Sequence, residues 1–256
     1  MSLFAEIAAL YERELRIPEN NVCRLRCDAR YKSPLLPWHV GEGYAADARR
    51  LLFIRRPHLR DEPVEDRPAG TLDGRATADR HFRTQPWPFW RSLREILKRV
   101  YGSEREGWRR VALTTIVKCA TSSGGPESND RTSATTKLCC IQQVGVIRQE
   151  LAILEPRTIV LLLGKGYDDW LKELLWARGQ EWRDTAGRSR VRLCGDVPLS
   201  WWEREIAGGR AAPVRLLRVG DPGGRPLAAY AAMLAGWIAG EEAQAAVRAR
   251  QGAPRR

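Results

Sequence analysis

The sequence predicts an α/β protein, a three-layer α/β/α sandwich around a central, mainly parallel sheet of four strands. Three observations support this fold class. Four short apolar runs, at residues 51–54, 111–117, 158–163 and 214–219, have the continuous hydrophobicity of strands covered on both faces. Segments with helical periodicity separate them. The 256 residues can bury a proper core, and we expect one domain over residues 1–244 and a basic tail over 245–256.

The first part of the chain predicts one helix and one strand. Ser2 can cap a helix that ends before Pro18 and that has apolar residues on one face, namely Leu3, Ile7, Leu10 and Tyr11. Residues 51–54 then form the first strand of the sheet. The segment 55–85 is rich in Arg, Asp, Pro and Gly and has no clear periodicity. Unstructured connections of this length are usually functional or mobile, so we expect a binding loop.

The rest of the chain supplies the remaining strands and their covering helices. An amphipathic helix over residues 87–100 leads to a βαβ unit, formed by the strand 111–117, a helix over about 136–154 and the strand 158–163. A helix over 167–177 follows, and residues 180–209 carry no clear pattern. The last strand, 214–219, precedes a helix that begins at Pro226, a residue favoured at the first helical position.

The charge of the chain indicates its partner. Lys and Arg number 43 against 31 Asp and Glu, a net charge of +12, and the arginines are spread over nearly every segment. Arg makes forked contacts with phosphate, so DNA is the expected partner; the alternative is an Arg-rich composition inherited from a GC-rich genome. The N-terminus carries Glu6 and resembles no export signal, and the longest apolar stretch, 227–239, is shorter than the roughly 18 residues of a membrane span. We therefore expect a cytoplasmic monomer.

A series of motifs resembles the uracil-DNA glycosylase superfamily, most closely its branch with an iron-sulfur cluster. In chain order these motifs are Cys23 and Cys27, Val40-Gly41-Glu42-Gly43, the strand 51–54, Thr114-Thr115-Ile116-Val117-Lys118-Cys119, a cysteine at 139 or 140, and Pro156 before residues 159–164. The resemblance runs from about Cys23 to Trp237. It implies an enzyme that flips a base out of DNA and excises it.

Three departures from the family pattern concern the substrate. Residues 55–62 replace a glycine-rich turn that bears an acid and a proline, Thr115 stands where the family commonly has a base-reading Asn, and residues 221–223 replace a His-Pro-Ser loop. Uracil is therefore not the expected substrate. A pocket with smaller side chains admits a bulkier pyrimidine, such as the hypermodified cytosines of phage DNA, which suggests a role in antiviral defence.

Three carboxylates are candidates for catalysis at the sugar. Asp61 and Glu62 follow the first strand and Asp221 follows the last, so all three are expected at the carboxyl ends of parallel strands, where ligands bind in such sheets. A carboxylate there can stabilise an oxocarbenium-like sugar and orient the attacking water. The alternatives are a solvated charge pair for Asp61 and Glu62, and a turn or helix cap for Asp221. No Lys stands at an obvious nucleophile position, so we expect a monofunctional glycosylase.

Other residues near the same strand ends are candidates for contacting DNA. His58 and Thr115 could contact the edge of an everted base, and Phe82 could stack on its face, although a buried core position is the commoner fate of an aromatic residue. Five arginines could bind the flanking phosphates, although each alone could be an ordinary surface residue: Arg55, Arg56, Arg60, Arg218 and Arg225.

The resemblance implies that four cysteines bind a [4Fe-4S] cluster: Cys23, Cys27, Cys119 and Cys140. Three residues separate Cys23 from Cys27, where the family usually has two, and Cys139 competes with Cys140. The alternatives are buried free thiols or a zinc site.

Two other classes of function remain open beside a DNA glycosylase that hydrolyses the N-glycosidic bond. The first is a catalytically inactive DNA-binding protein that keeps the glycosylase fold. The second, a nucleotide-binding or phosphate-binding α/β protein, is disfavoured because no glycine-rich phosphate loop follows the first strand.

Overall fold

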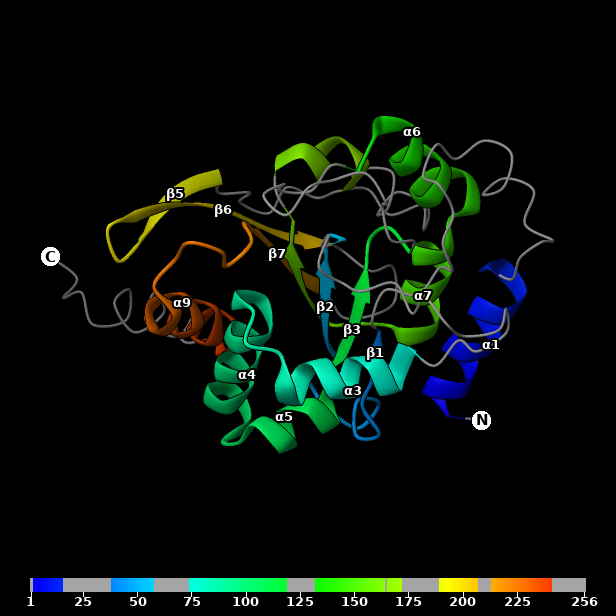
Figure 1. Cartoon of the computed structure of the whole chain (residues 1–256), viewed down its shortest axis with the longest axis horizontal. Coiled ribbons are helices and arrows are strands. Elements are labelled where there is room, and N and C mark those ends of the chain that lie inside the picture. The colour runs from blue at the N-terminus through cyan, green and yellow to red at the C-terminus, as the bar shows by residue number, and fades with distance from the viewer. Residues whose placement is uncertain are drawn as a thin grey trace, which may run out of the picture.

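The structure is a computed structural model that describes residues 2–15, 38–57, 74–118, 132–163, 165–171, 189–206 and 213–240. These residues form a mixed α/β fold around a seven-stranded sheet with the order β1-β3-β2-β4-β7-β6-β5 (Figure 1). The strands are β1 (His39–Val40), β2 (Leu51–Arg55), β3 (Ala112–Thr115), β4 (Thr158–Leu162), β5 (Ser189–Cys194), β6 (Val197–Ile206) and β7 (Val214–Val219).

The four predicted strands are confirmed as the parallel centre of this sheet. β3, β2, β4 and β7 are neighbours, and Phe53 in the middle of β2 is in register with Leu113 on one side and Val160 on the other. The predicted four-stranded sheet is nevertheless too small. β1 pairs with β3, β6 pairs with β7 and β5 pairs with β6, all antiparallel. β1 has two residues, and β6 alternates buried with partly exposed side chains, so neither shows a continuous apolar run.

Helices cover both faces of the sheet, because neighbouring residues of its strands point to opposite sides. Leu52 and Ile54 join a hydrophobic cluster with α1 (Leu3–Leu15) and α7 (Val146–Leu154), and Leu51 and Phe53 join another with α4 (Pro88–Tyr101) and α9 (Leu227–Ala239). Figure 1 shows these two helix pairs on opposite sides of the strands. This arrangement is consistent with the predicted three layers.

The predicted binding loop over residues 55–85 is wrong in its second half. Residues Gly74–Thr84 form helix α3, which buries Ala78, His81 and Phe82. These positions lie three and four residues apart, on one face of a helix, but the surrounding arginines hide the pattern. Residues 58–73 lie outside the described residues, as does the predicted tail over 245–256.

The predicted helix over residues 136–154 is three successive segments. α6 (Ala134–Lys137) continues into a π-helix, η1 (Leu138–Val144), and α7 follows. Gly145 separates the last two at a φ of 65°, and its N–H donates to the carbonyl of Cys140. Glycine adopts this left-handed conformation at little cost. The π-helix buries Cys139, Cys140 and Ile141.

The predicted helix ends are close to the observed ones. Ser2 caps α1, since its Oγ accepts a hydrogen bond of 3.2 Å from the N–H of Ala5. α9 begins at Leu227, one residue after the predicted start, and Pro226 is its N-cap residue. The helix predicted over 167–177 follows a short 3₁₀ helix, η2 (Lys165–Tyr167). Residues 168–171 are helical, and residues 172–177 lie outside the described residues. No helix in the described part of the chain is long and apolar enough to cross a membrane.

Helix α5 (Glu104–Arg110) is attached to the turn that follows β1 by close backbone packing. The N–H of Gly41 donates to the carbonyl of Val111, and a Cβ on Gly41 would lie 2.2 Å from the carbonyl oxygen of Arg109. Only glycine fits this approach. The motif Val40-Gly41-Glu42-Gly43 therefore has a structural reason here, whatever its further role.

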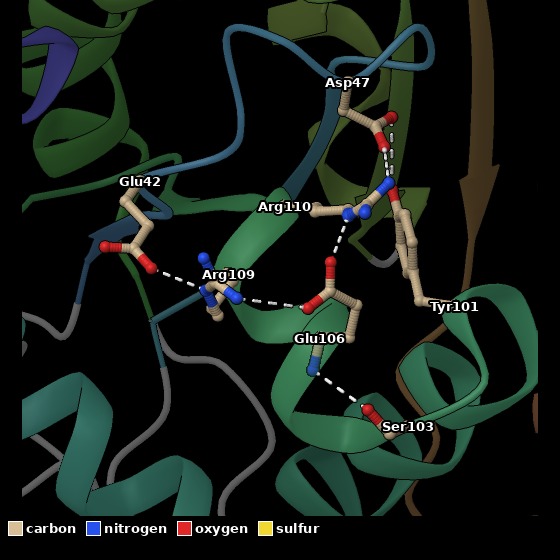
Figure 2. A network of polar contacts seen from close by, with 7 residues as sticks. All are labelled: Glu42, Asp47, Tyr101, Ser103, Glu106, Arg109 and Arg110. Atoms are coloured by element: carbon tan, nitrogen blue, oxygen red, sulfur yellow. Dashed lines mark hydrogen bonds and ion pairs between the residues drawn. The ribbon is translucent and has the colours of Figure 1, made fainter.

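An ionic network reinforces the same attachment (Figure 2). Arg109 lies between Glu42 and Glu106, at 2.5 and 3.4 Å. Arg110 contacts Glu106 at 2.5 Å and Asp47 at 3.8 Å. The network holds α5, and with it the start of β3, against the turn of residues 41–47.

Candidate active site

The order of the parallel strands defines where a ligand crevice is expected. The chain leaves β2 toward β3 on one side, and leaves β4 toward β7 on the other side. β2 and β4 are neighbours, so their connections part in opposite directions at their carboxyl ends. In open α/β sheets such a switch point forms the ligand crevice.

Three of the predicted site residues come together beside this switch point. The Nε atom of Arg56, just after β2, lies 3.6 Å from Oδ2 of Asp221, just after β7. Oδ1 of Asp221 accepts a hydrogen bond of 2.9 Å from the N–H of Gly223. Arg225 donates to the carbonyls of Asp221 and Gly223, at 2.6 and 2.9 Å. Because β4 lies between β2 and β7, the Arg56–Asp221 pair spans the carboxyl end of β4.

The two oppositely charged side chains are partly exposed, 16% for Arg56 and 20% for Asp221. The Asp221 carboxylate is thus held in one place by two neighbours while part of it still faces solvent. The Nε atom of Arg225 is buried and makes no hydrogen bond within the described part of the chain. A partly exposed carboxylate held in this way can stabilise a developing positive charge or orient a water molecule.

Two other predicted DNA contacts, Arg55 and Arg218, are buried among internal partners. Arg55 is 3% exposed, and its guanidinium lies over the rings of Phe89 and Trp90 at 5.1 and 5.6 Å. Arg218 is 4% exposed and donates to Ser200 Oγ and Asp168 Oδ2 at 2.8 and 2.9 Å. Either arginine would have to leave these partners to bind a phosphate.

Thr115, the predicted contact to the base edge, is 1% exposed at the end of β3. Its carbonyl accepts a hydrogen bond of 2.7 Å from Nζ of Lys118, which also donates to Thr114 Oγ1 at 2.6 Å. Lys118 therefore folds back onto β3 instead of pointing into the crevice.

Lys118 belongs to a buried ionic cluster that sequence reasoning missed. Its Nζ lies 2.5 Å from Oε1 of Glu150 on α7, and the hydroxyls of Thr114 and of Tyr11 on α1 donate to the same carboxylate at 2.9 and 2.5 Å. Burial lowers the pKa of Lys118 and raises that of Tyr11 well above its usual value. The cluster ties the carboxyl end of β3 to both helices of one face. Glu150 lies on the face of α7 that packs against the core, and a glutamate at such a position indicates a buried partner for its charge.

The remaining predicted residues are not brought to this site. Phe82 stacks on Trp108, which precedes β3, and so lies toward the amino end of that strand. His58, Arg60, Asp61 and Glu62 lie outside the described residues. Their predicted roles stay predictions.

Of the four cysteines expected to bind a cluster, only Cys140 is described, and Cys23, Cys27 and Cys119 are not. Cys140 Sγ accepts a hydrogen bond of 3.2 Å from the N–H of Lys118, the residue before Cys119. Cluster thiolates accept hydrogen bonds of this kind, so the surroundings of Cys140 fit a ligand. Within the described ranges no three His, Cys, Asp or Glu residues are grouped to hold a metal ion.

No protein-family model and no curated protein sequence matches this chain. The resemblance to the uracil-DNA glycosylase superfamily thus depends on the motifs and their spacing alone.

Proposed function

We propose that this protein is a monofunctional DNA glycosylase that everts a modified base and hydrolyses its N-glycosidic bond. The observation that carries the proposal is the Arg56–Asp221 pair, which sets a partly exposed carboxylate beside the switch point of a parallel sheet. The net charge of +12 suits a DNA partner. The order of motifs that resemble the glycosylase superfamily supports the same conclusion.

The proposed reaction uses Asp221 at the sugar. As the bond between C1′ and the base nitrogen breaks, its electron pair leaves with the base and positive charge develops on the sugar. The Asp221 carboxylate stabilises that charge and orients a water molecule, whose oxygen bonds to C1′. One proton of the water is released and the base takes up a proton, so the products are the free base and an abasic site. Arg56 and Arg225 contact flanking phosphates.

The proposed substrate is a modified pyrimidine, with the hypermodified cytosines of phage DNA as the leading candidates. This part depends on the altered recognition motifs, among them Thr115 in place of an amide side chain. It places the enzyme in antiviral defence.

A base-release assay tests the reaction. The protein is incubated with single-stranded and duplex oligonucleotides that contain uracil, cytosine or glucosylated hydroxymethylcytosine, and with phage genomic DNAs; released bases are identified by mass and abasic sites by alkaline cleavage. Release of the modified base is expected. Release of uracil alone would end the substrate proposal, and no release from any DNA would end the glycosylase proposal.

Two variants test the role of Asp221. Asp221→Asn should lower kcat by about 10²–10⁴-fold, the usual range for a carboxylate that acts at the reacting centre. Asp196→Asn is the matched control, since Asp196 is exposed in the turn between β5 and β6. Full activity of Asp221→Asn would assign catalysis to other residues.

A second candidate function is a DNA-binding protein that keeps the glycosylase fold without its activity. The burial of Thr115 and Arg55 favours it, because neither side chain reaches the crevice in this structure. Such a protein would retard DNA in a gel and leave no alkali-labile sites.

We also propose that Cys140 ligates a [4Fe-4S] cluster together with Cys23, Cys27 and Cys119. The cluster would supply structural stability at the end of β3. Anaerobically purified protein should absorb blue light and contain iron, and Cys140→Ser should lose both properties. Cys139→Ser should keep them, and a colourless, iron-free wild-type protein would contradict the proposal.

A further inference from the structure

A hollow of about 590 Å³ lies between the turn after β1, helix α3 and helix α5. Trp108 and Arg109 line it, and the chain enters β3 at Ala112, just beyond them. The hollow therefore lies at the amino end of the parallel strands, whereas Arg56 and Asp221 lie at the carboxyl end. Figure 1 shows α3 and α5 together at the end of β3 where this strand begins.

Three stacked rings form the floor of the hollow. Trp108 lies between His39 and Phe82, with ring centroids at 3.8 and 4.2 Å and interplanar angles of 11° and 8°. Nε1 of Trp108 donates to Oδ1 of Asp79 at 2.7 Å, and Nε2 of His39 lies 2.7 Å from the carbonyl of Trp108. The three rings are at most 7% exposed. The floor is thus rigid, and a ligand would depend on the rim for polar contacts.

The charges of the rim fall into an engaged and an unengaged set. Arg109 is held by Glu42 and Glu106, as Figure 2 shows, and Asp79 is held by Trp108. Arg83 on α3 and Arg105 on α5 are exposed and line the hollow. Neither guanidinium group makes a hydrogen bond or an ion pair within the described part of the chain.

Three acids, Glu42, Asp79 and Glu104, also line the hollow. Glu104 lines the hollow and is close enough to Arg94 to counteract the lowering of the Arg94 pKa that burial causes. Two guanidinium groups on separate helices, neither in an ion pair within the described residues, therefore line the same hollow. The formal charges of the lining balance, with three arginines and three carboxylates, so an anion would depend on direct contacts with these two groups and not on a net positive field. The hollow has the size of a small-ligand site.

We propose that this hollow is a second ligand site that binds a phosphate group of a nucleotide or of a nucleic-acid backbone, through Arg83 and Arg105. Guanidinium groups form forked, charge-assisted hydrogen bonds with phosphate oxygens. A purely apolar ligand does not suit the charged rim. The site is separate from the crevice at the other end of the strands, so it adds a binding function to the proposed catalysis.

The test compares two double variants with the same loss of charge. Arg83→Gln/Arg105→Gln removes the proposed contacts, and Arg80→Gln/Arg91→Gln removes two exposed arginines of α3 and α4 that do not line the hollow. Calorimetry then measures the binding of pyrophosphate, thymidine monophosphate, a single-stranded 12-mer and a duplex of unmodified DNA to each protein. All four substituted positions are exposed, and circular dichroism checks that both variants are folded.

The expected result is a loss of at least about tenfold in affinity for the first double variant and little change for the second, because each lost charge-assisted hydrogen bond has a large effect. Binding of pyrophosphate and thymidine monophosphate identifies a nucleotide site; binding of the oligonucleotides alone identifies the nucleic-acid backbone. Binding that weakens equally in both double variants, or the absence of binding by every probe, overturns the proposal.

The outcome is independent of catalysis at the other end of the strands. Asp221→Asn should bind pyrophosphate as the wild-type protein does, whether or not the protein releases a base.

Discussion

The buried pair Lys118 and Glu150 allows a quantitative prediction about the stability of the fold. The two side chains are 5% and 1% exposed and 2.5 Å apart. Replacing one member leaves the other as a buried charge without its counterion, which costs about 3–5 kcal/mol. We therefore expect Lys118→Met and Glu150→Leu each to lower the free energy of unfolding by that amount.

The double variant should be far more stable than the sum of the single effects implies. It buries no charge, and the two hydroxyls that lose the carboxylate, of Tyr11 and Thr114, lie 3.3 Å apart and can bond to each other. Replacing both members of a buried pair by apolar residues is often close to neutral. The coupling free energy between the two positions should therefore reach at least about 2 kcal/mol.

Urea unfolding, followed by tryptophan fluorescence and by circular dichroism, measures these free energies. The surface pair Glu95 and Arg99, at 2.9 Å with both side chains at least 30% exposed, is the control, and its coupling should be about 0.3–0.5 kcal/mol. If the Lys118 and Glu150 effects are additive to within about 0.5 kcal/mol, the pair does not act as a unit and our account of the cluster is wrong.

Three further predictions concern single residues. Gly41→Ala should destabilise the protein by about 3 kcal/mol or more, because the new Cβ meets the carbonyl of Arg109 at 2.2 Å, whereas Gly43→Ala, at 3.3 Å from the same oxygen, should cost well under half of that; equal effects in urea unfolding would contradict this reason. Burial raises the pKa of Tyr230 well above its usual value, so the unfolded chain loses this proton first, near pH 10, and stability is lost as the pH rises further. Tyr230→Phe should therefore reduce the decline in unfolding free energy between pH 10 and 11 by about 1 kcal/mol, and identical declines in the two proteins would exclude a buried, protonated phenol. Ser103→Ala should cost about 1 kcal/mol, because Ser103 Oγ accepts a hydrogen bond of 3.1 Å at the start of α5; an unchanged thermal midpoint would show that this cap is replaced by solvent.

Parts of the candidate site could be predicted because they follow from strand ends. Arg56 and Asp221 each come just after a buried apolar run, and the carboxyl ends of parallel strands share one edge. That rule places Arg56 and Asp221 at the same edge of the sheet. The rule does not say which way a side chain points, so it could not separate Arg56 from Arg55, its neighbour, which packs under Phe89 and Trp90.

Other parts could not be predicted because their signals are weak in the sequence. α3 buries only a few residues among many arginines, so its periodicity is hidden. The hairpin of β5 and β6 joins the sheet through backbone hydrogen bonds between β6 and β7. Its exposed Val191 and Leu193 do not distinguish a strand from a loop in the sequence. The hollow is formed by α3 and α5 together, so no pattern within a single segment of the sequence predicts it.

The sequence alone determined the parallel core and the basic character of this protein. A continuous apolar run is a property of one short segment, and net charge is a sum over residues, so neither requires knowledge of tertiary contacts. The tertiary structure decided which charges meet. Tyr11 and Glu150 are 139 positions apart, yet they share a hydrogen bond because α1 and α7 cover the same face. Arg83 and Arg105 face one hollow because α3 and α5 fold to the same end of the sheet. Periodicity specifies which face of an element is buried, but the partner of each side chain depends on the order of the strands and on the packing of helices across them.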